Sequence, residues 1–161
     1  MSLRSTLLIS SAAVLGAVAW YFFRPDRAFL DSRVSEPPPA ETATVLLSGQ
    51  FTPRAHEGRG LVQVLEFADG QRVLRFSGFE TLNGPDLQVY LIGSAAAARR
   101  ADLESAGYRS LGPLKGNVGD QNYAIPPGTD LVRYRAVAVW CRRFGVNFTT
   151  AVLAAPGPAG G

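Results

Sequence analysis

The chain has 161 residues, of which 47% are hydrophobic and 18% are charged, and its formal net charge is +3. These values are ordinary for a globular protein and leave room for one domain with appendages. The basic residues are spread along the chain instead of forming a stripe with interleaved aromatics. We therefore expect no nucleic-acid partner.

The first expected element is an apolar N-terminal segment. Residues 5–23 carry no charge and are flanked by Arg4 and Arg24. A helix of this length spans roughly 28 Å, close to the hydrocarbon thickness of a bilayer, and its aromatic end is typical of a membrane interface. The alternative is a signal peptide cleaved at the small residues 17–19. We favour an uncleaved single-pass anchor at 1–24, because the apolar stretch continues through that site.

A polar segment without periodicity follows the anchor. Residues 25–43 include the motif SEPPPAE, and proline runs favour an extended, semi-rigid spacer. The C-terminal residues 155–161 are mostly glycine, proline and alanine, which predicts a disordered tail. The folded domain is therefore expected at 44–154.

Strand periodicity dominates this domain. The dipeptide Asp69-Gly70 between two apolar runs predicts a tight hairpin, and residues 94–107 are the one stretch with a helical composition. Residues 111–130 are interpreted as a glycine-rich connection. Strands are expected at 45–51, 61–67, 71–79, 87–93, 131–141 and 144–153. The predicted fold is all-β, an antiparallel β-sandwich-like domain with one short helix, preceded by an N-terminal transmembrane helix.

The only cysteine of the chain, Cys141, ends one of these strands. It is either inert packing, a reactive thiol, a metal or haem ligand, or half of an intermolecular disulfide. Strand alternation places it on the same face as Val137 and Val139, and both faces are apolar, which predicts a central strand. If the strand continues, Arg143 lies on the same face with its Cα about 7 Å away and favours the thiolate. The alternative is that Cys141 serves only as a small apolar residue that packs in the core.

Several stretches together resemble the DM-thirteen domain, an electron-transfer module often associated with DOMON domains. They are GQF at 49–51, His56, LRFSGFETLNGPDLQVYL at 74–91, LGPLKGNVGDQNYAIP at 111–126 and YRAVAVWCRRFGVNFTTAVL at 134–153. The resemblance implies a β-sandwich-like domain outside the cytoplasm. It also implies that the family's characteristic cysteine, here Cys141, acts as a redox thiol or as a ligand to a group such as haem.

The residue types in the sequence limit which kinds of redox site are possible. Covalent haem attachment needs two cysteines, whereas thiolate-ligated haem needs one sulfur and a deep apolar pocket. His56, the only histidine, is the candidate second ligand, and an ordinary loop histidine is the alternative. Four ligands for structural zinc are lacking. A bare thiol that cycles through a sulfenic acid or a mixed disulfide is the simplest hypothesis.

Polar residues in the predicted turns form a second candidate site. They could converge on a ligand, or they could hydrogen-bond their own turns, which is common for such residues. Asn147 also begins a glycosylation motif. The candidate ligand-binding residues are Asn83, Asp86, Lys115, Gln121 and Asn122.

Two hypotheses of function follow. In the first, the chain is anchored in the cell membrane with its domain on the extracytoplasmic side, periplasmic or at the cell surface, and exchanges electrons with a redox protein through Cys141. In the second, the domain is a non-catalytic binding module and Cys141 is part of its core. Neither hypothesis describes a conventional enzyme.

Overall fold

The computed structural model describes residues 31–39 and 42–156. The predicted membrane helix at 1–24 lies outside these residues. Within the described part of the chain, no helix is both long and apolar enough to cross a membrane.

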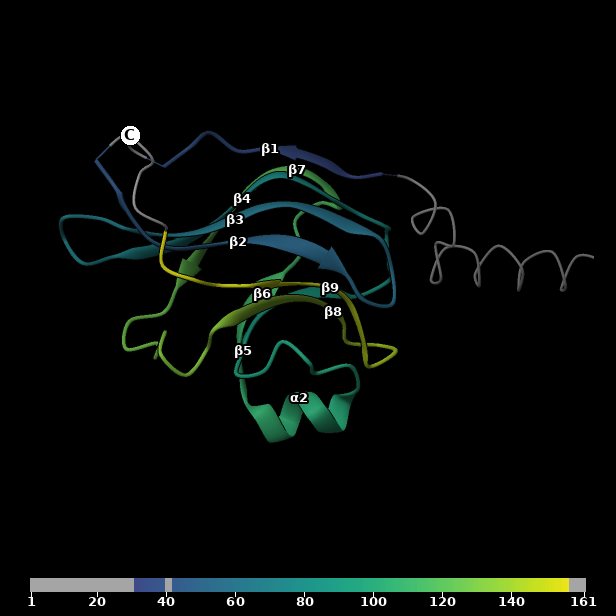
Figure 1. Ribbon diagram of the computed structural model, residues 1–161. Coiled ribbons are helices and arrows are strands. Elements are labelled where there is room, and N and C mark those ends of the chain that lie inside the picture. The colour runs from purple at the N-terminus through teal and green to yellow at the C-terminus, as the bar shows by residue number, and fades with distance from the viewer. Residues whose placement is uncertain (1–30, 40–41, 157–161) are drawn as a thin grey trace, which may run out of the picture. The chain divides into compact units, whose positions relative to one another are not determined.

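The described residues form nine strands and one short helix, which confirms a mostly β fold (Figure 1). Their order along the chain is β1 (Arg33–Ser35), β2 (Thr44–Pro53), β3 (Gly58–Glu66), β4 (Arg72–Thr81), β5 (Leu87–Ile92), α2 (Arg100–Ala106), β6 (Tyr108–Pro113), β7 (Val118–Ile125), β8 (Ala136–Cys141) and β9 (Val146–Val152).

All nine strands belong to one curled sheet with the order β1-β7-β4-β3-β2-β9-β8-β5-β6, where the sequence predicted a β-sandwich-like domain. The two halves are joined at β2, which pairs with β3 along most of its length and with β9 from Phe51 to Pro53. Gly49 permits the junction, because a Cβ there would lie 2.1 Å from the carbonyl oxygen of Val152. One pair also departs from the antiparallel prediction, since β1 runs parallel to β7.

The predicted hairpin is present between β3 and β4. Phe67 donates its backbone N–H to the carbonyl of Gln71 at 2.9 Å, and Gly70 has a φ of 80°. A positive φ is the backbone conformation that glycine adopts without steric cost, so the dipeptide determines the turn.

Three expected element boundaries are wrong. The helix begins at Arg100 instead of residue 94, because Asp102 accepts the backbone N–H groups of Ala98 and Arg99 and caps it there. The interpreted connection 111–130 holds the end of β6 and all of β7, because Gly116 and Gly119, before and within β7, made this stretch resemble a loop. The predicted linker 25–43 contains β1, which is stabilised by contacts with residues distant in the sequence.

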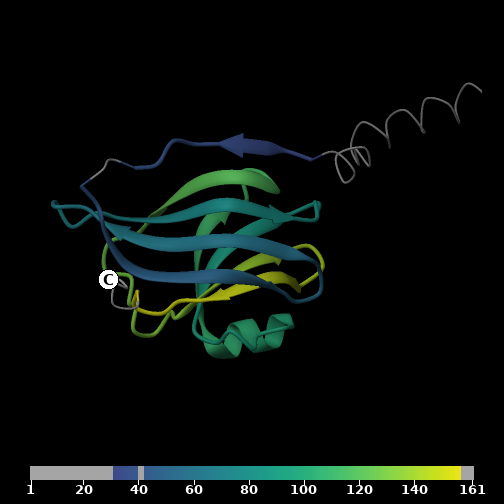
Figure 2. The same ribbon diagram turned by 45° about the horizontal axis from the view of Figure 1, so that its top comes forward.

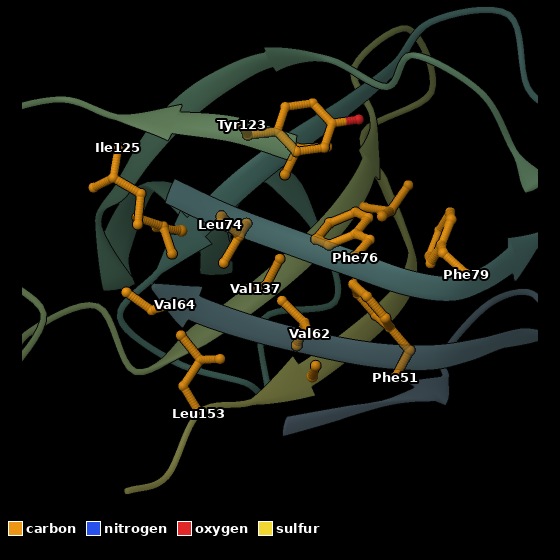
Figure 3. Packing of buried hydrophobic residues seen from close by; sticks show 14 of the residues in the cluster. Phe51, Val62, Val64, Leu74, Phe76, Phe79, Tyr123, Ile125, Val137 and Leu153 are labelled. Atoms are coloured by element: carbon orange, nitrogen blue, oxygen red, sulfur yellow. The ribbon is translucent and has the colours of Figure 1, made fainter. Parts of the chain in front are cut away.

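The main core fills the inside of the curl. Phe76 is central, with ring centroids 4.8 Å from Phe51, 5.0 Å from Phe79 and 5.3 Å from Tyr123 (Figure 3). A smaller cluster on the outer face of β5 and β8 includes Trp140 and packs toward α2. Because β8 contributes side chains to both clusters, its prediction as a central strand buried on two faces is confirmed.

Several loops lie at the end of the sheet where the described chain begins (Figures 1 and 2). We call this the entry end. Strand directions and backbone hydrogen bonds place the loops together there, and the carboxyl end of β8 lies at the same end of the sheet. The entry end consists of Asp31 and the loops 54–57, 82–86, 114–117 and 142–145.

Candidate functional site

Cys141 is the last residue of β8 and its exposed fraction is 0%. Its cross-strand neighbours are Leu87 on β5 and Val146 on β9. Cys141 belongs to the main core, together with Val139 on the same strand face. The thiol is therefore surrounded by apolar side chains, at the entry end of the fold.

The loop before β5 is bound to the residue that follows the thiol. Arg142 donates its backbone N–H to the carbonyl of Asp86 and its Nε to Oδ2 of the same residue, both at 2.9 Å. Gln88 donates to the other carboxylate oxygen, Oδ1, at 2.7 Å. The hydrogen bond and the charge of Asp86 raise the pKa of the Arg142 guanidinium. This double link between Asp86 and Arg142 is referred to below as the latch.

The same loop lies directly on the core beside the thiol. A Cβ at Gly84 would lie 3.0 Å from atoms of both Leu87 and Phe148, so the loop has little free space beneath it. His56 packs its ring against Phe148 with centroids 4.0 Å apart. The structure thus places His56 at the entry end as an aromatic packing partner.

Arg143 does not extend the strand of the thiol. The chain turns after Cys141, and Gly145, with a φ of 65°, donates its backbone N–H to the Cys141 carbonyl at 2.9 Å. Arg143 is exposed in this turn. Because the strand does not continue, Arg143 is not aligned with the thiol as predicted. Arg142 is the arginine that is bound near the thiol.

Gln121, Lys115 and Asn122 belong to a second network, around the start of β7. Gln121 is fully buried and closes the turn before β7, because its Nε2 donates to the Gly116 carbonyl at 2.7 Å and its Oε1 accepts from Tyr123 at 2.6 Å. Burial raises the pKa of the Tyr123 hydroxyl well above its ordinary range. Asn83 accepts a hydrogen bond from the Gly84 N–H at 2.8 Å within its own turn. Asp86 and Asn83 therefore lie in the loop before β5, whereas Gln121, Lys115 and Asn122 lie around the start of β7.

Lys115 and Asn122 bind the segment that contains β1. Both oxygens of the Glu36 carboxylate are engaged, one by Lys115 Nζ and one by the Asn122 backbone N–H, each at 2.6 Å. Burial raises the pKa of Glu36, but these two hydrogen bonds and the positive charges of Lys115 and Arg75 outweigh burial and lower it overall. We call residues 31–37 the strap.

Arg75 reinforces the strap from the outer face of β4. It is only 7% exposed, donates to Asp120 at 2.6 Å and to Asn122 at 3.0 Å, and also reaches the Pro37 carbonyl at 3.1 Å. Arg75 and Glu36 were not predicted from the sequence, because nothing in the local pattern indicates that a further strand pairs with the edge of β7.

Two further expectations can be compared with the structure. In the described residues no group of three or more His, Cys, Asp or Glu side chains could hold a metal ion. Asn147 is 1% exposed, and its amide nitrogen donates to Ala97 and Thr150 at 2.8 Å. Glycosylation at this motif is incompatible with the folded chain.

Comparison with known proteins gives one match. A family model described as Electron transfer DM13 matches residues 50–153, which is more than half of the chain. No match was found among curated proteins or among solved structures. The matched region includes Cys141 and the latch, whereas the strap lies before it.

Proposed function

Because the chain belongs to the DM13 electron-transfer family, we propose that it is a membrane-anchored, extracytoplasmic redox module in which the Cys141 thiol exchanges electrons with a partner protein. The observation that carries this proposal is the position of Cys141 inside the family match, at the end of β8 and beside the latch.

The proposed chemistry is thiol–disulfide exchange with two classes of protein partner. The Cys141 thiolate attacks a disulfide of the acceptor, a new S–S bond forms, and the released acceptor sulfur takes up the proton that Cys141 lost. One thiol of a donor dithiol then attacks the Cys141 sulfur and frees the reduced acceptor. The second donor thiol then attacks the donor sulfur of this mixed disulfide, which breaks its bond to Cys141 and returns Cys141 to the thiol form. The donor is oxidised to a disulfide and two electrons reach the acceptor.

Burial makes this exchange depend on local opening. A fully enclosed sulfur cannot be attacked in line, so the loop 82–86 must move before a partner sulfur can approach. Such openings cost less than global unfolding when few interactions hold a segment. The latch and the packing beneath Gly84 are the contacts that this movement must break.

The residues around Cys141 do not fit a haem. A thiolate-bound haem needs a deep cavity at the sulfur, but the thiol is enclosed by core side chains such as Leu87 and Val146. The ring of the candidate second ligand, His56, is packed on Phe148. We therefore derive no step through haem.

Reaction of the full-length chain with an aromatic disulfide tests the thiol chemistry. We expect one aryl thiolate released per chain, at a rate that stops rising at high reagent concentration because opening becomes limiting, and no release from Cys141→Ala. The rate of global unfolding is measured in parallel. A reaction of the thiol that is no faster than global unfolding would contradict the proposal.

The second candidate function is a binding module without redox chemistry. The complete burial of Cys141 in the main core favours it, since free cysteines commonly serve as small apolar residues. In that case Cys141→Ala keeps the biological activity while the native thiol stays inert.

The anchor is supported by the uncharged residues 5–23. Alkaline extraction of membranes tests it directly. The full chain should stay in the membrane fraction, and a variant with Leu15→Arg should be released.

A further inference from the structure

The turn between β8 and β9 carries an exposed aromatic side chain at the entry end. Phe144 is 68% exposed, and the neighbouring Arg142 and Arg143 are exposed as well. Single exposed apolar side chains are common on protein surfaces, so Phe144 is considered together with the charged side chains around it.

Two more arginines come from the start of α2. Arg100 donates to the backbone carbonyl of Arg142 at 2.9 Å, and Arg99 forms an isolated β-bridge with Val146. Asp86, Asp102 and Glu104 are the acidic residues that contact or belong to these elements, so the four arginines exceed them by one positive charge. We call this surface the basic tip. It comprises Arg99, Arg100, Arg142, Arg143 and Phe144.

The first residues of the strap lie at the same end of the sheet as the basic tip. Asn117 holds the beginning of the strap at the entry end through hydrogen bonds of 2.7 Å to Asp31 and Ser32. The described chain therefore begins at the same end of the sheet as the basic tip.

We propose that the basic tip docks on the membrane surface, with Phe144 in the headgroup layer and the arginines on the phosphates of anionic lipids. The inference rests on the anchor in the proposed function. Aromatic side chains favour the interface, and each arginine close to an anionic surface adds attraction. Docking turns the Cys141 end of the domain toward the bilayer, so the partner sulfur must come from a protein that is itself at the membrane.

The test uses the full chain in vesicles of phosphatidylcholine, with or without an equal part of phosphatidylglycerol, and with brominated acyl chains as quenchers. The added tryptophan fluorescence of Phe144→Trp is compared with that of Val132→Trp. Val132 is 82% exposed and lies in the loop between β7 and β8, at the opposite end of the sheet.

We expect the added fluorescence of Phe144→Trp to be quenched in the anionic vesicles, while that of Val132→Trp is not. Adding Arg143→Gln should lower the ratio of docked to undocked domain about fivefold, whereas Arg109→Gln on β6 should leave it unchanged. Equal quenching at both positions in vesicle-bound protein would contradict docking but not the anchor. The basic tip would then be a surface for an acidic protein. Protein that does not cofractionate with vesicles would overturn the anchor, and docking with it.

Discussion

Asp86 binds Arg142 through both its backbone carbonyl and its carboxylate, and this relationship ties the loop before β5 to the residue that follows the only thiol. The guanidinium is largely solvent-exposed, so the side-chain pair alone contributes little. Its importance is geometric, because the loop it holds covers the core beside Cys141.

Asp86→Ala should open this region. Losing the carboxylate bonds to Arg142 and Gln88 is expected to lower the cost of local opening by about 1–2 kcal/mol, which is about a 5- to 30-fold faster reaction of Cys141 with a maleimide. The matched control is Glu66→Ala, which removes the 2.8 Å pair with Arg72 near the opposite end. Equal rates in the two variants would show that the latch does not control access.

Cys141→Ala and Cys141→Ser should differ in stability. The alanine variant leaves a small cavity and is expected to lose about 1 kcal/mol. Serine introduces a hydroxyl among apolar neighbours and should cost about 1–3 kcal/mol more. Denaturant unfolding of both variants measures the difference. A serine variant as stable as the alanine variant would mean that water or a polar partner reaches this position.

Acidification should release the strap. Since the pKa of Glu36 is lowered from its ordinary 4.5 in the folded chain, its stabilising contribution is complete above that value and is lost as the pH falls through the folded pKa. We expect faster hydrogen exchange of the Glu36 amide, which donates to the Asp120 carbonyl at 3.0 Å. Glu36→Gln should exchange faster already at neutral pH, by about fivefold, and show no such pH dependence. A wild-type exchange rate that keeps its neutral-pH protection even after the Glu36 carboxylate is protonated, after correction for intrinsic rates, would contradict this.

A pair of glycine substitutions isolates the contact between the strap and β7. Gly119 and Gly112 have nearly the same φ, 108° and 109°, so alanine is strained at both, by about 1–3 kcal/mol. Only at Gly119 would the added Cβ collide with the strap, 2.0 Å from the Val34 carbonyl oxygen. Gly119→Ala should therefore expose the strap to protease, while Gly112→Ala should leave it protected. Equal cleavage would mean that β1 tolerates displacement.

The strands of the main core could be predicted because their patterns are local. Alternation around Val137 and Val139, and the Asp69-Gly70 turn, express side-chain direction and backbone φ, which depend on neighbouring residues alone. The β7 strand was missed because Gly119 within it and Gly116 before it permit the close approach of the strap, which no local pattern reveals.

The candidate site was predictable only in part. Cys141 could be placed at a strand end beside the core, but where the strand stops depends on the turn formed by Gly145 and on the bond from Arg142 to Asp86, distant in sequence. For the same reason strand alternation points to Arg143 instead of Arg142. The role of Lys115 and Asn122 follows from Glu36, which lies 79 and 86 residues before them in the chain.

The strap also determines how copies of this protein behave toward one another. Without β1, the edge of β7 would present unpaired N–H and C=O groups that could join the sheet of another molecule. β1 is only three residues long, and Pro37, Pro38 and Pro39 follow it without an N–H to donate. A strand this short, followed by prolines, is a poor template for growth. Copies crowded side by side on a surface would therefore be protected from fusing into fibrils through this edge.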